Sequence, residues 1–373
     1  MMVIGLVGGG TAGHFYPLIS VSEHLNSIQN KPELYYFGPS PYDKNALEEL
    51  GIKYVFCPAG KLRRYFSIQN FFDFFKNIFG VLVAIWKLYI IYPDVIFSKG
   101  GYTSVPVLLA ARFLRIPVVI HESDAFPGRA NLLSRNQAQY VGIAYKEAAK
   151  YFSEKKTALV GIPLRKEIKE KFDDPLSLLG IPKDKPLIYV TGGSQGAERI
   201  NNLIMMSLNI LLPEYRIFHQ VGAGNIYELR LTAKSLLENS PLQNYYYIEG
   251  TLSSKQVSAL MQAADLIITR AGSTTLFEIS YHKKPSIVIP IPEDISRDQR
   301  SNAYAYARRG GATVIEEHNL SPNLLKQEID FILKNENNKK AMSMAAARFY
   351  IEGAEEKISN ILISIGQEHG TYQ

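Results

Sequence analysis

A histidine follows a glycine-rich turn near the start of the chain. The stretch "VIGLVGGGTAGHFYP" (residues 3–17) is an apolar run, then a group of glycines, then His14. Glycines between a strand and a helix leave main-chain N–H groups open to a phosphate, and the helix dipole adds to the attraction. Because imidazole titrates near neutral pH, His14 on such a loop fits a general base. The structural alternative is that His14 caps the helix or bonds the next loop.

The same loop chemistry recurs without a histidine in "TGGSQGAERIN" (residues 191–201). Its glycines can wrap an oxyanion, and Ser194 can donate a hydrogen bond to that anion just before a helix begins. The spacing is neither Walker A nor G-x-G-x-x-G, which disfavours ATP and NAD. The alternative is a tight connection between a strand and a helix.

Two more segments of the second half follow expected strands. "ITRAGSTTLFEIS" (residues 268–280) places Glu278 six residues after Gly272, from where a carboxylate can reach ribose hydroxyls. A solvated helix face is the alternative for Glu278. "PIPEDISRDQRSNA" (residues 290–303) carries Gln299 on a loop at the carboxyl end of a strand, where parallel sheets bind ligands. An exposed connection is the alternative there.

The segment "HESDAFPGRAN" (residues 121–131) offers two carboxylates, Glu122 and Asp124, after a strand of the first half. They fit a general base or a site for sugar hydroxyls. Equally, they fit a structural role in which Glu122 is tied to backbone amides. No pattern such as H-E-x-x-H or C-x-x-C indicates a catalytic metal, so neither a metal nor another cofactor is expected.

Short β-branched runs alternate with helical stretches from end to end, which predicts parallel sheets buried on both faces. Spacings repeat between the halves: glycines 9, 10 and 13 recur as 192, 193 and 196, and Asp94 and Lys99 recur as Asp265 and Arg270. We therefore expect an α/β protein with two Rossmann-like, doubly wound domains separated by a cleft. The expected domains are residues 1–163 and 164–345, with a long helix over 346–373 returning to the first domain.

Composition bounds the class of protein. The 373 residues are 46% apolar and 20% charged, which is typical of a soluble globular protein. The formal charge of +6 favours anionic partners, but no arginine–aromatic alternation points to nucleic acid, and none is expected. Cys57 is the only cysteine, which excludes internal disulfides and suits a reducing compartment. No secretory signal begins the chain, so we expect a cytoplasmic location.

From Phe71 to Ile91 the chain is mostly apolar and aromatic. Asp73, Lys76 and Lys87 interrupt this stretch, so we expect no transmembrane helix. Basic residues lie just before it, which favours a helix lying on an anionic leaflet. The expected membrane contacts are Arg63, Arg64, Phe71, Phe75 and Trp86. The alternative is a core helix packed on the sheet.

With these motifs in view, nearly the whole chain resembles the MurG family, the membrane-associated N-acetylglucosaminyltransferases of peptidoglycan synthesis. The shared motifs occur in family order: "GGGTAGHFYP", "KGGYTSVPVLLAA", "HESDAFPGRANLLS", "VGIPLR", "GGSQGAERIN", "HQVGAGN", "TRAGSTTLFEI" and "DQRSNA". The resemblance implies a GT-B fold, with UDP-N-acetylglucosamine (UDP-GlcNAc) held mainly by the C-terminal domain. It also implies an undecaprenyl-linked acceptor, lipid I, held by the N-terminal domain. The location it implies is the cytoplasmic face of the cell membrane, as a peripheral protein on the anionic inner leaflet.

The resemblance also assigns residues. The implied donor contacts are Thr11, Gly13, Arg165, Gly192, Gly193, Ser194, Gln195, Ser273, Thr274, Glu278 and Gln299. The implied acceptor contacts are Gly10, Thr11, His14, Lys99, Gly101, Tyr102, Thr103, Ser104, Asp124 and Asn131. The family reaction inverts the anomeric centre in one displacement, with His14 as the base and Glu122 or Asp124 as substitutes. Ser123 and Asp124 stand where the family usually has two amides, which puts acceptor contacts in doubt, and Ile162 stands where an Asn is common.

Three other functions compete with this one. A related GT-B enzyme would glycosylate another lipid such as diacylglycerol. A non-catalytic scaffold would bind the nucleotide sugar without turnover. A nucleotide-sugar epimerase of the same architecture would have no use for an apolar, basic docking helix.

Overall fold

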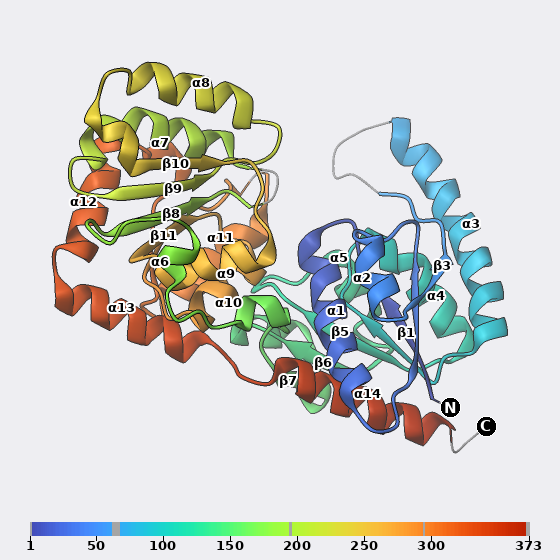
Figure 1. The fold of residues 1–373 in the computed structure, drawn as a ribbon. Helices are drawn as coiled ribbons and strands as arrows, with labels where there is room; N and C mark the ends of the chain where they lie inside the picture. The colour runs from blue at the N-terminus through green and yellow to red at the C-terminus, as the bar shows by residue number, and fades with distance from the viewer. Residues whose placement is uncertain (1, 62–67, 194–195, 294, 371–373) are drawn as a thin grey trace. The chain divides into compact units, whose positions relative to one another are not determined.

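The computed structural model describes residues 2–61, 68–193, 196–293 and 295–370 (Figure 1). The chain divides into two compact units: Met1–Arg165 together with Ile351–Gln373, and Lys166–Tyr350. Each unit is built around one parallel sheet, and helices connect most of its successive strands.

The first unit holds a seven-stranded sheet in the order β3-β2-β1-β4-β5-β6-β7. Its strands are β1 (Val3–Val7), β2 (Glu33–Gly38), β3 (Lys53–Phe56), β4 (Val95–Ser98), β5 (Val118–Glu122), β6 (Ala138–Ile143) and β7 (Thr157–Leu159). All neighbouring strands run parallel. The strand order reverses between β1 and β4, and in such sheets the loops at the carboxyl ends of these two strands form the usual binding crevice.

Helices cover both faces of this sheet. One face packs against α1 (Ala12–Ser27) and α14 (Ala354–Gly370), the other against α3 (Ile68–Ile91) and α4 (Val105–Leu114). Shorter helices are α2 (Lys44–Glu49), α5 (Arg129–Ser134) and the 3-10 turns η1 (Tyr102–Ser104), η2 (Lys146–Tyr151) and η3 (Glu154–Lys156). The strands are apolar on both sides because both faces are buried.

The second unit holds a six-stranded parallel sheet in the order β10-β9-β8-β11-β12-β13. Its strands are β8 (Leu187–Thr191), β9 (Arg216–Gln220), β10 (Tyr246–Glu249), β11 (Leu266–Thr269), β12 (Ser286–Val288) and β13 (Ala312–Val314). Successive residues of β8 face opposite cores. Ile188 and Val190 pack with α7 (Glu198–Leu211), α8 (Ile226–Leu236) and α12 (Pro322–Leu333), whereas Leu187 and Tyr189 pack with α6 (Pro175–Leu178) and α9 (Ser254–Ala263). This alternation is the two-residue period of a strand buried on both faces.

The helices of the second unit are α6 (Pro175–Leu178), α7 (Glu198–Leu211), α8 (Ile226–Leu236), α9 (Ser254–Ala263), α10 (Ser273–Tyr281), α11 (Arg297–Ala307), α12 (Pro322–Leu333) and α13 (Glu336–Phe349). Three 3-10 turns accompany them: η4 (Lys166–Lys169), η5 (Pro241–Tyr245) and η6 (Glu317–Asn319). The residue echo between the halves has a structural counterpart. Asp94 Oδ2 accepts a hydrogen bond from Val3 N (2.7 Å), and Asp265 Oδ2 accepts one from Leu187 N (2.9 Å). In both units an aspartate just before the fourth strand ties that strand to the start of the first.

The structure differs from the sequence-based expectations at three places. The three-residue strand β13 was not expected, because so short a run carries no apolar pattern. The long helix expected near the C-terminus is two helices, since α13 ends at Phe349 and Gly353 adopts φ +72° before α14 begins. Arg165 belongs to the first unit rather than opening the second, and the return to the first unit comes at Ile351 rather than at residue 346.

Candidate functional site

His14 lies in the first turn of α1, directly after the glycine loop. Thr11 is the N-cap residue in extended conformation, yet its side chain makes no capping bond; Thr11 Oγ1 instead lies 2.7 Å from His14 Nδ1. Nε2 of His14 has no hydrogen-bond partner among the described residues. Burial, then the charge of Lys99, lowers the pKa of His14 below its ordinary value, against the raising effect of Asp124. The result is a neutral imidazole with one free nitrogen.

The glycine loop is held in shape by two tyrosines. Tyr36 on β2 donates a hydrogen bond from its hydroxyl to Gly8 O (2.9 Å). Gly10 adopts φ +85°, and a Cβ there would lie 2.9 Å from the ring of Tyr102, so only glycine fits. These two contacts hold the backbone of the glycine loop in one conformation.

Glu122 ends β5 and serves the loop that follows. Its Oε1 accepts from Asp124 N (2.9 Å), and its Oε2 accepts from Gly128 N (3.0 Å) and Asn131 Nδ2 (2.8 Å). Burial, with a contribution from Asp124, raises the pKa of Glu122 to about 7. Both oxygens are occupied by the protein itself, which favours the structural alternative over a role as base.

Lys99 follows β4 with a side chain that is only 1% exposed. Its Nζ lies 2.5 Å from His121 Nδ1 and donates to Ser123 Oγ. His121 Nε2 lies 2.7 Å from Gly161 O, so Nε2 carries the proton and Nδ1 accepts from the ammonium. Burial lowers the pKa of Lys99 to about 8, despite the opposing charges of Glu122 and Asp124.

The acceptor residues implied by the resemblance divide into two groups. Gly10, Thr11, His14, Gly101, Tyr102 and Asp124 are exposed or half-buried at the carboxyl ends of β1, β4 and β5. The other four, Lys99, Thr103, Ser104 and Asn131, are buried. Ser104 donates to Gly101 O (2.8 Å), and Asn131 donates to Glu122, so these two shape the loops. The burial of all four favours a role in shaping the loops over direct contact with a substrate.

The glycine loop of the second unit links β8 to α7. Gly193 adopts φ +86°, and its N–H donates to Thr191 Oγ1 (3.1 Å). A Cβ on Gly196 would lie 2.1 Å from Val221 O, so the loop runs directly over the end of β9. Gly192 and Gly193 stand at this turn as expected, whereas Ser194 and Gln195 lie outside the described residues.

The first turn of α10 brings the other implied donor residues together. Ser273 Oγ accepts a hydrogen bond from Asn302 Nδ2 (2.9 Å) on α11, and Thr274 is half-buried beside it. Glu278 is buried, which contradicts a solvated helix face. Burial raises the pKa of Tyr189 on β8, and the charge of Glu278 adds to this rise. Gln299 Oε1 on α11 is buried with no hydrogen-bond partner among the described residues.

Arg165 lies in the first unit. Its guanidinium carbon is 4.1 Å from the ring centre of Tyr16 on α1, a cation–π contact. Tyr16 in turn donates from its hydroxyl to Asp43 Oδ2 (3.4 Å). Sequence reasoning missed this pairing, since nothing in the motif "VGIPLR" points to the first helix. Gly13 lies in the first turn of α1 and is half-buried.

α3 presents an apolar surface to solvent. Only Gly80, Ala84 and Leu88 of this helix are buried, a stripe that packs in the core shared with α4. Phe71, Phe75 and Trp86 are 63%, 54% and 59% exposed; Arg63 and Arg64 lie outside the described residues. By length and composition α3 is long and apolar enough to cross a membrane. The charged residues within it therefore do not exclude a transmembrane span, contrary to the expectation from the sequence.

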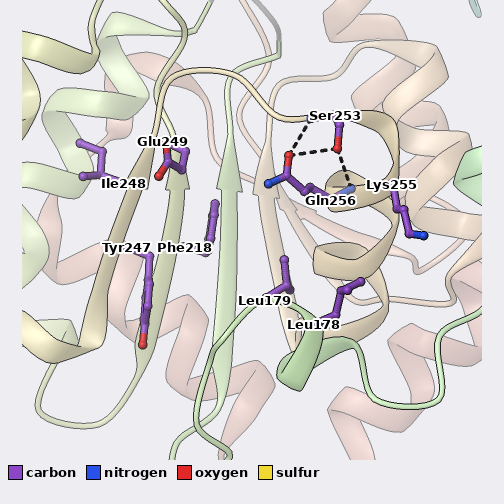
Figure 2. Close-up of a pocket in the computed structure, with 9 residues that line it drawn as sticks. All are labelled: Leu178, Leu179, Phe218, Tyr247, Ile248, Glu249, Ser253, Lys255 and Gln256. Atoms are coloured by element: carbon purple, nitrogen blue, oxygen red, sulfur yellow. Dashed lines mark hydrogen bonds between the residues drawn. The ribbon is translucent and has the colours of Figure 1, made fainter.

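No cluster of three or more metal-ligating side chains occurs in the described ranges. A separate pocket of about 470 Å³ lies in the second unit between β9, β10 and helices α6 and α9 (Figure 2). The nearly parallel rings of Phe218 and Tyr247, 6.1 Å apart, form one wall, and the capping box of Ser253 and Gln256 forms part of another. None of the implied donor residues lines it.

Comparison with known proteins covers almost the whole chain. The N-terminal domain of glycosyltransferase family 28 matches residues 4–143, and the C-terminal domain of the same family matches residues 187–358. The UDP-N-acetylglucosamine–N-acetylmuramyl-(pentapeptide) pyrophosphoryl-undecaprenol N-acetylglucosamine transferase of Clostridium kluyveri is 36% identical over 97% of this chain and 99% of its own. A Bacillus cereus protein of the same name, numbered 2, is 35% identical over 98% of this chain and 100% of its own.

Solved structures share the fold. MurG of Acinetobacter baumannii superposes with a TM-score of 0.74 at 22% identity, covering 97% of this chain and 99% of that one. A UDP-N-acetylglucosamine 2-epimerase from Neisseria meningitidis bound to UDP-GlcNAc reaches 0.69 at 13% identity, over 98% and 100% of the two chains. The two-domain GT-B fold thus hosts different reactions, and the fold alone does not choose between them. The matches to both domains of the family and to full-length relatives show the family: the chain belongs to glycosyltransferase family 28.

Proposed function

We propose that this protein transfers N-acetylglucosamine from UDP-GlcNAc to the 4-hydroxyl of the muramyl sugar of lipid I, giving lipid II for peptidoglycan. The observation that carries the proposal is the identity of 35–36% over nearly the full length to transferases named for this reaction. In this proposal the first unit holds the acceptor and the second unit holds the donor.

In this proposal the first unit supplies the base. His14 has a free Nε2 and a lowered pKa, so it is unprotonated at neutral pH and can take the proton of the attacking hydroxyl. Asp124, half-buried in the same loop cluster, is the substitute. Glu122 is not a base in this scheme; it holds the loop that presents Asp124.

The second unit binds the donor. The main-chain N–H groups at Gly192, Gly193 and the start of α7 would hold the diphosphate and stabilise the leaving UDP. Glu278 would accept hydrogen bonds from the ribose hydroxyls, as acidic residues do in related nucleotide folds. Gln299, whose buried carbonyl oxygen lacks a partner in the described structure, and Ser273 with Thr274 would contact the phosphate and sugar. Thr11, Gly13 and Arg165 lie in the first unit and would meet the donor only from that side.

We also propose that α3 rests on the anionic inner leaflet as a peripheral anchor, at the cytoplasmic face of the membrane. Although α3 is long enough to span a membrane, its buried residues Gly80, Ala84 and Leu88 face the core of the first unit. In addition, Asn77 Oδ1 accepts a hydrogen bond from Gly60 N (2.9 Å), and Asn77 Nδ2 donates one to Gly60 O (3.1 Å). A spanning helix would have to break both contacts. The exposed Phe71, Phe75 and Trp86 would enter the interface, and no nucleic-acid partner is proposed.

The test is a transfer assay with UDP-GlcNAc labelled in the sugar. The purified protein is given a short-chain lipid I analogue in one reaction and diacylglycerol in another. Label in the lipid I analogue alone is the expected result. Label in the diglyceride would overturn the acceptor assignment, and UDP binding without transfer to any acceptor would indicate a scaffold.

A further inference from the structure

The motif "HQVGAGN" (residues 219–225) has no task in the proposed reaction, although it spans the end of β9 and the segment that leads to α8. His219 and Gln220 are 0% and 7% exposed, so their hydrogen bonds show what they do. Successive residues of a strand face opposite sides of its sheet. Ile217 packs in the core shared with α7, and Phe218 packs in the core shared with α9. His219 therefore faces α7, and Gln220 faces the other side of the sheet.

On the α7 side, His219 is one link in a chain of hydrogen bonds. Its Nε2 lies 3.1 Å from Asn201 Oδ1, and its Nδ1 lies 2.9 Å from Tyr246 Oη. Because the oxygen of Asn201 can only accept, Nε2 carries the proton and Nδ1 accepts from the tyrosine hydroxyl. The amide of Asn201 is thereby turned so that its Nδ2 donates to Val221 O (3.1 Å). His219 thus fixes the first turn of α7 against the segment that follows β9.

On the opposite side of the sheet, Gln220 acts through a hydroxyl group. Its Oε1 accepts hydrogen bonds from Tyr189 Oη (2.7 Å) and Thr191 Oγ1 (3.0 Å), both on β8. Since Thr191 gives its only hydroxyl proton to Gln220, its oxygen is left to accept from Gly193 N (3.1 Å). Gln220 thus fixes the direction in which the chain leaves β8.

The glycine loop between β8 and α7 joins these two sets of contacts. Gly196 N donates to Gly193 O (3.0 Å). A Cβ on Gly192 would lie 2.5 Å from Ala197 N, so the two ends of the loop lie against each other. A Cβ on Gly196 would lie 2.1 Å from Val221 O, the oxygen that is held from α7. A shift at either end would therefore move the whole loop.

We propose that His219 and Gln220 are positioning residues for the diphosphate of the donor: from opposite sides of the sheet, they hold the two ends of the glycine loop in the conformation that binds phosphate. Main-chain N–H groups bind an anion best when they already point at it, because no ordering cost then opposes binding. The inference rests on the proposed binding of UDP-GlcNAc by this loop. It requires no contact between either side chain and the donor.

The test compares the affinity for UDP with the affinity for uridine, which has the same base and ribose but no phosphate. The variants are His219→Leu on one side of the sheet and Gln220→Met on the other. In each variant the Kd for UDP should rise about tenfold, the loss of one hydrogen bond to a charged group, whereas the Kd for uridine should stay that of the wild type. Calorimetric titration measures UDP binding to the full-length protein, and NMR titration measures the weaker binding of uridine.

Conservative variants separate positioning from stability. His219→Gln, which can still donate to Asn201 Oδ1, should bind UDP more tightly than His219→Leu. Thr191→Val removes the hydroxyl through which Gln220 acts and should behave like Gln220→Met, whereas Thr191→Ser keeps the hydroxyl and should restore the affinity for UDP. Ser207→Ala is the matched control, since the buried hydroxyl of Ser207 donates to a main-chain oxygen within α7 (2.6 Å), away from the loop. It should change neither affinity.

Equal losses of affinity for UDP and uridine would overturn the proposal, because the two residues would then serve only the stability of the second unit. Unchanged binding of UDP by the folded variants would overturn it as well. If His219→Leu or Gln220→Met fails to fold, the pair Thr191→Val and Thr191→Ser decides in the same way. A wild type that binds UDP no more tightly than uridine would show that the loop holds no diphosphate. The expected binding ratios without transfer to lipid I would support this inference and count instead against the proposed acceptor.

Discussion

The two units place a cation at the same point of the same scaffold and use it differently. Lys99 and Arg270 each come five residues after the aspartate that ties the fourth strand to the first. Lys99 is bonded to a neutral imidazole and a hydroxyl. Arg270 donates to Ile289 O (3.1 Å) and Pro290 O (3.2 Å) and forms an ion pair with Glu317 (3.4 Å).

The difference lies in what cancels the charge. In the second unit, the guanidinium of Arg270 is neutralised by the carboxylate of Glu317. It also donates hydrogen bonds to main-chain carbonyls after β12, in the loop that leads to α11 and Gln299. The ammonium in the first unit has neutral hydrogen-bond acceptors, and the nearby charges of Glu122 and Asp124 favour its charged form without an ion pair in the described residues. Repeated sequence spacing thus reports the scaffold, whereas the hydrogen-bond partners of the cation differ between the two units.

The sharpest way to break this comparison is to remove the base itself. His14→Ala should lower kcat by roughly 10²- to 10⁴-fold, the usual contribution of a positioned general base. The affinity for UDP should stay unchanged because the second unit is untouched. Steady-state assays and calorimetric titration with UDP measure the two quantities. A kcat close to that of the wild type would exclude His14 as the base.

Removing the architectural cation should act on stability instead. Arg270→Met leaves Ile289 O and Pro290 O without this donor and leaves Glu317 with the more distant Arg199 (3.7 Å). Breaking a largely buried ion pair is costly, so we expect a loss of about 3 kcal/mol in the free energy of unfolding of the second unit. Urea denaturation followed by circular dichroism measures it. Lys99→Met is the matched variant, and an equal loss there would erase the contrast between the two cations.

Acid should weaken the second unit through His219. Burial lowers the pKa of this histidine to about 3; it is bonded to Asn201 Oδ1 (3.1 Å) and Tyr246 Oη (2.9 Å). The unfolded chain binds a proton below pH 6.5 while the folded chain does not, so stability is present above pH 6.5 and is lost as the pH falls. Between pH 6.5 and pH 5 the loss is about 2 kcal/mol. Urea midpoints at both pH values check this, and His219→Gln should reduce the dependence by that amount, while the part due to His282, whose pKa burial lowers to about 4, should remain.

The smallest effect concerns the donor pocket. Glu278→Gln keeps the shape of the side chain but removes the charge from the hydrogen bonds proposed to the ribose. A loss of about 1.4 kcal/mol corresponds to a tenfold rise in the KM for UDP-GlcNAc. The KM for the acceptor should not change. Equal effects on both substrates would show that Glu278 serves the fold rather than the nucleotide.

Much of the fold was predictable from local patterns. Apolar runs predict buried strands, and the repeated glycines and aspartates indicated two sheets with equivalent first and fourth strands. β13 was not predictable because three residues at a sheet edge carry no period. The break between α13 and α14 was hidden in the same way: "FYIEGA" continues an amphipathic pattern, and only Gly353 marks the turn.

The site was predictable in position but not in bonding. His14, Lys99 and Glu122 lie at one edge of the first sheet, because the carboxyl ends of the parallel strands β1, β4 and β5 meet there, and the sequence had placed His14 and Glu122 after strands. Which of them is free depends on contacts made across the loops. The three hydrogen bonds that occupy Glu122 and the pairing of Lys99 with His121 arise from tertiary packing, which no single-sequence pattern encodes.

The composition of the first unit from two separate stretches bears on how the protein is made. Ile358 and Leu362 of α14 are fully packed in the core beside β1, and a Cβ on Gly366 would lie 3.2 Å from a Met2 side-chain atom. The ribosome synthesises these residues only after it has synthesised all of 166–350. The first unit is therefore completed only after the second has been synthesised. A premature stop near residue 350 would remove α14 from the core of the first unit and leave the second unit complete.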